Sequence, residues 1–127
     1  MNKQDLKLKF LQQLEDMINE IVNIFPDNKK IVSLREKYLM LKKANSKIII
    51  DTFISSVLIH KEKILTKDES FFLDGGYQDD ISEDHKIRYV SFIKDVWLNQ
   101  MTNENKEIVW QYFKVLVILS EKYSLFN

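Results

Sequence analysis

Apolar residues recur every three or four positions along most of the chain, which is the spacing of one face of an α-helix. The last segment, residues 103–126, departs from this pattern because apolar residues cover most of its circumference. Its polar residues form one narrow stripe of Glu107, Gln111, Lys114 and Glu121. A helix that is apolar over most of its girth is buried by several neighbours. The sequence therefore predicts that the C-terminal helix is the central element of an all-α fold.

Ile118 interrupts the polar stripe, between Lys114 and Glu121. Two interpretations are open. Either the C-terminal helix is buried all round at this point, which we favour, or Ile118 belongs to a contact patch on the surface. The two interpretations make opposite predictions for the exposure of this one side chain.

Breaks in the apolar pattern divide the rest of the chain into further helices. Pro26 should end the first helix, because proline disfavours helical geometry at the residue before it. We expect Asn2 or Asp5 to begin that helix, Asp27 or Asn28 to cap the second, and Thr102 or Asn103 to cap the last. Thr66 and Glu69 have the spacing of a capping box, and Asp74-Gly75-Gly76 should stop the short helix that this box begins.

These signals predict a single domain with a compact bundle of four long helices plus one short helix, in which the C-terminal helix is central. The local signals mark six helical segments, one more than this count, at about residues 3–25, 28–43, 46–64, 67–73, 83–101 and 103–124. The run from Ile48 to Ile59 is rich in β-branched residues, so a strand is the alternative there. We prefer a helix because Asp51, Ser55 and Ser56 do not alternate as a half-buried strand requires.

Charge is unevenly divided although the net charge is zero. Residues 1–67 hold 13 Lys and Arg against 8 Asp and Glu, and residues 68–127 hold 6 against 11, so the halves carry +5 and −5. The two halves can attract each other within one fold. The alternative is that the acidic segment 68–84 docks a basic partner or a second copy head to tail.

The residues that could carry chemistry do not form a recognisable site. An EF-hand loop starting at Asp74 would need oxygen-bearing side chains at its third and fifth positions and glycine at its sixth. Gly76, Gln78 and Asp79 occupy these positions, so the motif is not present. His60 and His85 lie 25 residues apart, and their spacing does not demand a metal site. Cysteine is absent, and we find neither a nucleophile elbow nor a glycine-rich phosphate loop. We therefore expect no cofactor, no metal and no catalytic residue. An enzyme with an unrecognised site is the second alternative function, after the nucleic-acid binding that is described next.

Basic residues of the first two predicted helices could form a patch for nucleic acid. They are Lys3, Lys7, Lys9, Lys29, Lys30, Arg35, Lys37, Lys42 and Lys43. Phosphate binding needs clustered positive charge, and base reading favours Arg, of which the chain has two. Nucleic-acid binding through this half is the first alternative function. No apolar run is long enough to predict a membrane span.

Three stretches of the chain carry a resemblance: Phe25 to Asn28, Lys67 to Leu73, and the pattern from Val109 to Leu119. Together they resemble small all-helical proteins encoded by large nucleocytoplasmic DNA viruses of algae and protists. Those proteins join a helix break of the type FP-D/E-N to a turn of the type K-D-E-x-F-F-L. They end in I-W-x-Y-h-x-x-L-x-x-L, in which h is apolar. The matching residues here are Phe25 to Asn28, Lys67 to Leu73, and a final pattern of Val109, Trp110, Tyr112, Phe113, Leu116 and Leu119, with Val in place of Ile. The resemblance implies a viral source and expression in the cytoplasm of the infected cell, with packaging in virions as a second location. It assigns no functional residue, because the matching positions are mostly core and cap residues.

From these features we expect a non-enzymatic interaction or structural protein that acts through a helical protein–protein surface, either with another protein or with itself. The candidate partner surface consists of Asp74, Tyr77, Asp79 and Asp80 in the acidic loop, together with Ile118.

Overall fold

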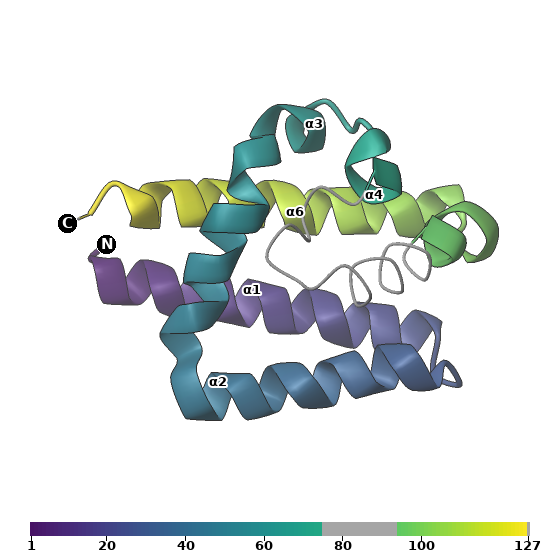
Figure 1. The fold of residues 1–127 in the computed structure, drawn as a ribbon, viewed down its shortest axis with the longest axis horizontal. Coiled ribbons are helices and arrows are strands. Elements are labelled where there is room, and N and C mark those ends of the chain that lie inside the picture. Colours follow the sequence, from purple (N-terminus) through teal and green to yellow (C-terminus); the bar gives the residue numbers. More distant parts are fainter. Residues whose placement is uncertain (75–93, 127) are drawn as a thin grey trace.

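The computed structural model describes residues 1–74 and 94–126, and every regular element in them is helical, which confirms the all-α prediction. The elements are α1 (Lys3–Ile24), α2 (Lys29–Ser56), η1 (Leu58–His60), α3 (Lys61–Leu65), α4 (Ser70–Asp74), η3 (Val96–Gln100) and α6 (Asn103–Ser124). In Figure 1, α1 and α6 lie side by side, and the two ends of the chain meet at one end of this pair.

Local sequence signals set the ends of the long helices. Asn2 caps α1 in a capping box with Asp5, in which the Asn2 side chain accepts from the Asp5 N–H at 2.8 Å. Helix α1 ends at Ile24, before Pro26, and Asn28 then caps α2 by accepting from Lys30 and Ile31. Thr102 caps α6 by accepting from the Asn105 N–H at 3.1 Å. These side chains satisfy N–H groups that have no partner within their own helix.

Helix α2 bends at the predicted break. Asn45 has non-helical backbone angles, with φ −161° and ψ 84°, so α2 consists of two helical segments joined at a kink, and the predicted break between residues 43 and 46 is confirmed. The first half of α2 lies along α1, and the second half crosses over α1 and α6 (Figure 1). The helix predicted for residues 46–64 also differs: α2 stops at Ser56, and the short η1 and α3 follow. In this region the Ser55 hydroxyl donates back to the Thr52 carbonyl at 3.1 Å, a bond that competes with helical geometry.

The predicted capping box of Thr66 and Glu69 is wrong, because Thr66 ends α3 and does not begin α4. The Thr66 hydroxyl donates to the Glu62 carbonyl at 2.8 Å. The next residue, Lys67, adopts a left-handed conformation with φ 55°. The Lys67 and Asp68 N–H groups then donate to Ile64 and Lys63, the two bonds of a Schellman motif. Asp68, not Thr66, accepts from the Ser70 N–H at the start of α4.

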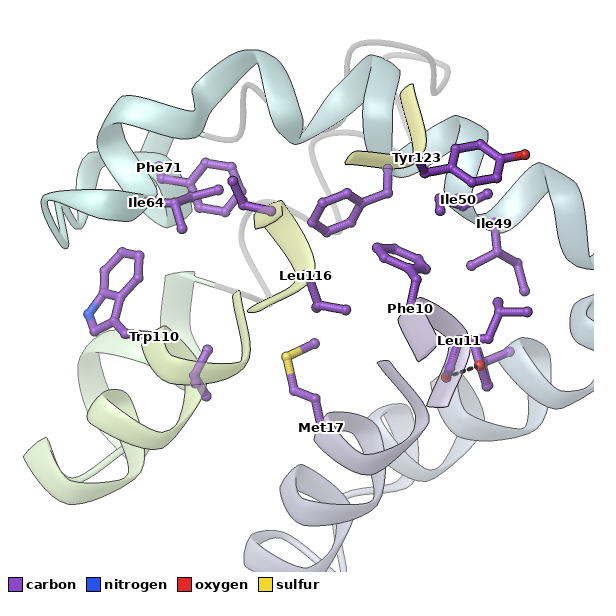
Figure 2. Packing of buried hydrophobic residues seen from close by; sticks show 14 of the residues in the cluster. Phe10, Leu11, Met17, Ile49, Ile50, Ile64, Phe71, Trp110, Leu116 and Tyr123 are labelled. Atoms are coloured by element: carbon purple, nitrogen blue, oxygen red, sulfur yellow. Dashed lines mark hydrogen bonds between the residues drawn. The ribbon is translucent and has the colours of Figure 1, made fainter. Parts of the chain in front are cut away.

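The core lies where α1, α2 and α6 meet. Leu116 of α6 points toward Phe10 and Met17 of α1, and all three are buried (Figure 2). A second, aromatic part of the core joins α4 and η3 to α6: the Phe72 and Trp97 rings stack at 4.2 Å, and Trp110 packs beside both. Helix α6 contacts α1, α2, α3 and η1, as expected of a central helix.

Helix α6 is not buried all round, so the interpretation that we favoured for Ile118 is wrong. The Ile118 side chain is 49% exposed and Val115, one turn earlier, is 39% exposed. The physical reason is the arrangement of its neighbours. Helix α1 and the second half of α2 cover α6 from the inner side, so in the described residues its opposite side faces solvent.

Candidate functional site

Of the five residues predicted to form a partner surface, Ile118 is the one whose side chain the structure describes on the surface. Asp74 is the last residue of α4. Tyr77, Asp79 and Asp80 lie outside the described residues, as does His85. The acidic-loop half of the predicted surface therefore stays a prediction, and the description below concerns the surface around Ile118 and a second surface that the sequence interpretation missed.

Ile118 belongs to an apolar row on the solvent side of α6, which we call the α6 row: Val115, Ile118 and Leu125. The spacing of three residues places Val115 and Ile118 on one face of α6, and Leu125, seven residues after Ile118, continues the row past the end of the helix. Leu125, which follows the last turn, is 77% exposed. Lys122 is the polar residue between them and is also exposed.

Toward its N-terminus, the same face of α6 becomes polar. Glu107 accepts two bonds from the Lys67 ammonium, at 2.7 and 2.9 Å, and one from the Gln111 amide at 2.8 Å. Hydrogen bonds from Lys67 and Gln111 lower the pKa of Glu107 below its usual range. The face therefore divides into a hydrogen-bonded polar half and an apolar half that begins at Val115.

The inner side of α6 fixes the direction in which the α6 row points. Leu116, Val117, Ser120 and Tyr123 are buried there, and the Ser120 hydroxyl is satisfied by donating to the Val117 carbonyl at 3.1 Å. The Lys61 ammonium donates to Glu121 at 2.7 Å and ties the flank of the helix to α3. This pair and the Lys67–Glu107 pair also join the basic half of the chain to its acidic half, as one of our two interpretations of the charge division expects.

A second exposed apolar surface lies on the first half of α2, residues 29–44, which we call the outer arm. Ile31, Leu34, Tyr38 and Leu41 recur at spacings of three and four residues, which predicts that all four face the core. Ile31 and Tyr38 are buried, but Leu34 and Leu41 are more than a third exposed. Leu39 and Met40 are exposed as well, Met40 by 71%. The arm remains exposed because, in the described part of the chain, α1 is the one helix that runs beside it (Figure 1).

A sequence signal for this surface does exist. Leu39, Met40 and Leu41 are consecutive. Consecutive positions on a helix are separated by about 100°, so a helix that packs against a single neighbour cannot bury all three. The inward-facing stripe alone does not account for Leu39 and Met40.

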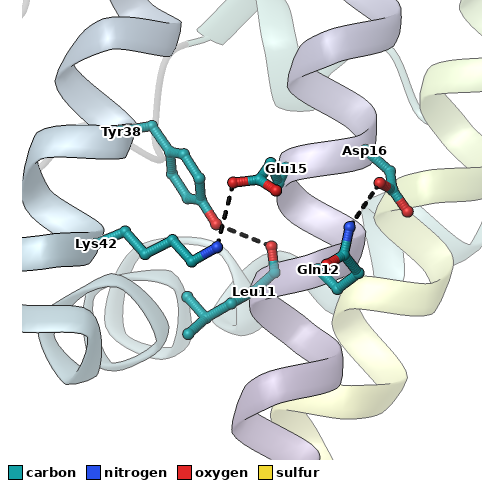
Figure 3. A network of polar contacts seen from close by, with 6 residues as sticks. All are labelled: Leu11, Gln12, Glu15, Asp16, Tyr38 and Lys42. Atoms are coloured by element: carbon teal, nitrogen blue, oxygen red, sulfur yellow. Dashed lines mark hydrogen bonds and ion pairs between the residues drawn. The ribbon is translucent and has the colours of Figure 1, made fainter.

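Two polar contacts attach the outer arm to α1 (Figure 3). The Tyr38 hydroxyl donates to the Leu11 carbonyl at 2.8 Å, and the Lys42 ammonium donates to Glu15 at 3.2 Å. Burial, together with the nearby charges of Glu15 and Asp16, raises the pKa of Tyr38 to about 12. The arm is therefore held to α1 by a neutral phenol and an ion pair in addition to apolar packing.

The arm also carries cations that form no ion pair with the residues that the structure describes. Within residues 1–74 and 94–126, no ion pair is formed by Lys29, Arg35 or Lys43. An open depression of about 420 Å³ lies at the start of the arm. It is lined by Pro26, Asp27, Lys29, Val32, Ser33 and Glu36.

The groups that could support catalysis or metal binding do not converge in the part of the chain that the structure describes. No group of three His, Cys, Asp or Glu side chains there could hold a metal ion. His60 packs against the Phe71 ring at 5.8 Å, and its buried Nε2 atom has no hydrogen-bond partner among the described residues. The Trp97 Nε1–H donates to Glu69 at 3.0 Å, and Lys106 lies 5.2 Å from the Trp97 ring. These contacts of Glu69 and Lys106 position the Trp97 indole ring.

Of the nine basic residues of the predicted nucleic-acid patch, six lie on the outer arm and three lie on α1. Lys3 lies where the chain ends meet, 4.8 Å from the Tyr123 ring, and Lys29 begins α2 beyond the far end of α1. Helix α1 has 22 residues, so it separates them by about 30 Å at 1.5 Å per residue. Lys42 is paired with Glu15.

Comparison with protein-family models, with curated proteins and with solved structures finds no match to this chain. Among the described residues, no helix is both long enough and apolar enough to cross a membrane. The two exposed helical surfaces are therefore the features of the described residues that point to a function.

Proposed function

We propose that this protein is a non-enzymatic interaction protein that self-associates through the α6 row. One observation carries the proposal: Val115 and Ile118 on one face of α6, and Leu125 just past its end, expose apolar side chains, and the other side of the helix is packed into the core. Single exposed apolar residues are ordinary on protein surfaces. Three on one helical face, beside a firmly packed core, are typical of a contact surface.

A second copy of α6 fits this row when the two helices run antiparallel. A two-fold axis between Val115 and Ile118 places Val115 of each copy against Ile118 of the other copy. Both copies then use the same patch. In that register Lys122 lies opposite Gln111 of the second copy and one turn from its Glu107. The apolar contact is then flanked by polar groups of opposite charge.

The proposed contact is small and apolar, which sets its expected strength and salt dependence. Stable dimers bury about 800 Å² per partner, and a contact between single helices buries less, so we expect a weak dimer. Added salt screens charges and leaves apolar contacts in place. The dimer should therefore persist at high ionic strength.

Molar mass by light scattering on a sizing column tests the proposal. At protein concentrations on the order of 100 μM, we expect the mass to exceed that of the 15.2 kDa chain at both low and high salt. Ile118→Asp should give the monomer, because it would bury a carboxylate in the contact. Ile59→Asp is the matched control, since Ile59 of η1 is also well exposed but lies off the α6 row. A wild-type monomer under all these conditions, or equal loss in both variants, would refute self-association through α6.

A viral source, action in the cytoplasm of the infected cell and packaging in virions stay predictions that rest on the resemblance of the sequence. The acidic loop also stays a predicted partner surface. Replacing Asp79 and Asp80 by Asn in the Ile118→Asp background, and comparing which partners each protein retains, would show whether the loop binds a partner independently of the α6 row.

A further inference from the structure

We propose that the outer arm is a docking surface for an acidic amphipathic helix of a partner protein. The surface is the side of the arm that carries Val32, Arg35, Leu39, Met40 and Lys43, which we call the arm face. This inference concerns a different helix from the α6 row, so it stands or falls independently of self-association.

The apolar residues of the arm face have the spacing of a helix–helix seam. Val32 and Leu39 are one heptad apart, and Met40 lies beside Leu39. Leu39 and Met40 are both exposed, so they could enter a partner's surface without any rearrangement of this chain. Met adapts to irregular surfaces, and it is frequent where proteins bind helices.

Positive charge accompanies this seam. Residues 29–44 contain six Lys and Arg and one acid, Glu36, a net charge of +5. Arg35, Leu39 and Lys43 follow one another at spacings of four residues, so the two cations lie on either side of Leu39 in a row about 12 Å long. Neither cation forms an ion pair within the described residues. Carboxylates that flank the seam of a partner helix would meet both of them, as e and g residues do in coiled coils.

The combination of apolar and basic residues decides between partner classes. A nucleic acid would use the cations but leave Leu39 and Met40 in water, because phosphates offer no apolar contact. A membrane surface would need a broad apolar face, often with Trp or Phe. The arm face has no aromatic residue and has Glu36 at its centre. An acidic helix with its own apolar stripe would contact both the apolar side chains and the cations of the arm face.

The arm face is preformed in the structure. Tyr38 and Lys42 hold the opposite side of the arm to α1 through the Leu11 carbonyl and Glu15. Ile31 and Tyr38 are buried on that same side. A rigid surface loses little conformational entropy on binding, which favours measurable affinity for a short helix.

Two synthetic helical peptides test the proposal by fluorescence anisotropy. Each has about 21 residues, three heptads with Leu at the a and d positions. One carries Glu and the other carries Lys at the flanking positions. We expect the wild-type protein to bind the Glu peptide at least about tenfold more tightly than the Lys peptide, a difference of about 1.4 kcal/mol. Equal binding of both peptides, or no binding of the Glu peptide, would overturn the proposal.

Three variants show where the peptide binds. Arg35→Glu with Lys43→Glu should weaken the Glu peptide by about tenfold or more and strengthen the Lys peptide. Leu39→Gln with Met40→Gln should weaken the Glu peptide without reversing the preference. Lys9→Glu is the charge control, because Lys9 is an exposed lysine of α1 away from the arm face. Circular dichroism verifies the fold of each variant. Equal weakening by the control would overturn the assignment to the arm face.

Other polyanions provide the remaining comparison. Vesicles containing phosphatidylserine and a short DNA duplex are titrated in the same buffer, with the wild type and the Leu39→Gln/Met40→Gln variant. The proposal expects both to bind more weakly than the Glu peptide. If either binds more tightly, and the apolar variant binds it unchanged, the arm face is a general anion surface and the proposal is wrong. The Ile118→Asp variant should retain peptide binding, which separates this surface from the α6 row.

Discussion

Replacing Tyr38 by Phe removes the hydroxyl that joins the outer arm to α1 and leaves the ring packing in place. At pH 7 the variant loses one hydrogen bond to the Leu11 carbonyl, which should lower the free energy of unfolding by about 0.5–1.5 kcal/mol. The pH dependence is more diagnostic. The pKa of Tyr38 is raised from 10.0 to about 12, so the fold favours the neutral phenol.

The sign of the effect follows from proton binding. Between pH 10 and 12 the unfolded chain has lost the Tyr38 proton while the folded chain keeps it, so stability falls as the pH rises. The contribution is complete below about pH 10 and is lost as the pH passes through about 12. Two pKa units correspond to at most about 2.7 kcal/mol, and we expect roughly half, because solvent screens the charges of Glu15 and Asp16 at this edge of the fold.

Urea unfolding of the wild type and of Tyr38→Phe, from pH 8 to 11, measures this effect. Lysines and the other tyrosines titrate in both proteins, so the difference between the two curves isolates Tyr38. The stability advantage of the wild type should shrink by about 1 kcal/mol between pH 8 and 11. An advantage that stays constant over this range would show that Tyr38 ionises freely, and that the arm is not held to α1 as the structure has it.

Three further changes test the packing, a helix cap and the aromatic cluster. Leu116→Ala should lower the free energy of unfolding by about 2.7–5 kcal/mol in urea titrations, since Leu116 is fully buried; a loss below about 1 kcal/mol would contradict a tight core. Thr102→Ala removes the cap of α6 and should cost about 1 kcal/mol, whereas no change would mean that another group caps the helix. Glu69→Ala removes the acceptor of the Trp97 indole N–H and should cost about 1 kcal/mol with a shift in tryptophan emission; an unchanged spectrum would contradict the bond.

The sequence was sufficient for the helical class, because helical periodicity and capping residues are local properties. Asn28 and Thr102 were each among the predicted caps, and each accepts the hydrogen bonds of a cap in the structure. Thr66 shows the limit of such signals. The pattern of Thr66 and Glu69 is that of a capping box, but Lys67 takes a left-handed conformation that ends α3 first. Glu69 then bonds Trp97, a residue 28 positions away, which no local pattern reveals.

The exposed surfaces were harder to predict, because exposure depends on which neighbours a helix acquires. Ile118 was recognised as unusual, but its sequence context could not decide between burial and exposure. Val115 and Leu125 are exposed because α1 and α2 cover the other side of α6, which is a tertiary arrangement that no local pattern reveals. Met40 was missed for the same reason: α2 bends at Asn45, and its first half is left beside α1.

Cysteine cross-linking tests the proposed α6 contact most directly, because the chain has no cysteine of its own. Val115→Cys and Ile118→Cys variants are purified separately, mixed and oxidised gently, and the covalent dimer is followed over time on a non-reducing gel. The antiparallel contact predicts that the mixture forms a disulfide dimer faster than an Ile59→Cys variant does at the same concentration. Equal rates for the mixture and for Ile59→Cys would mean that collisions alone bring the thiols together, and would contradict self-association through α6.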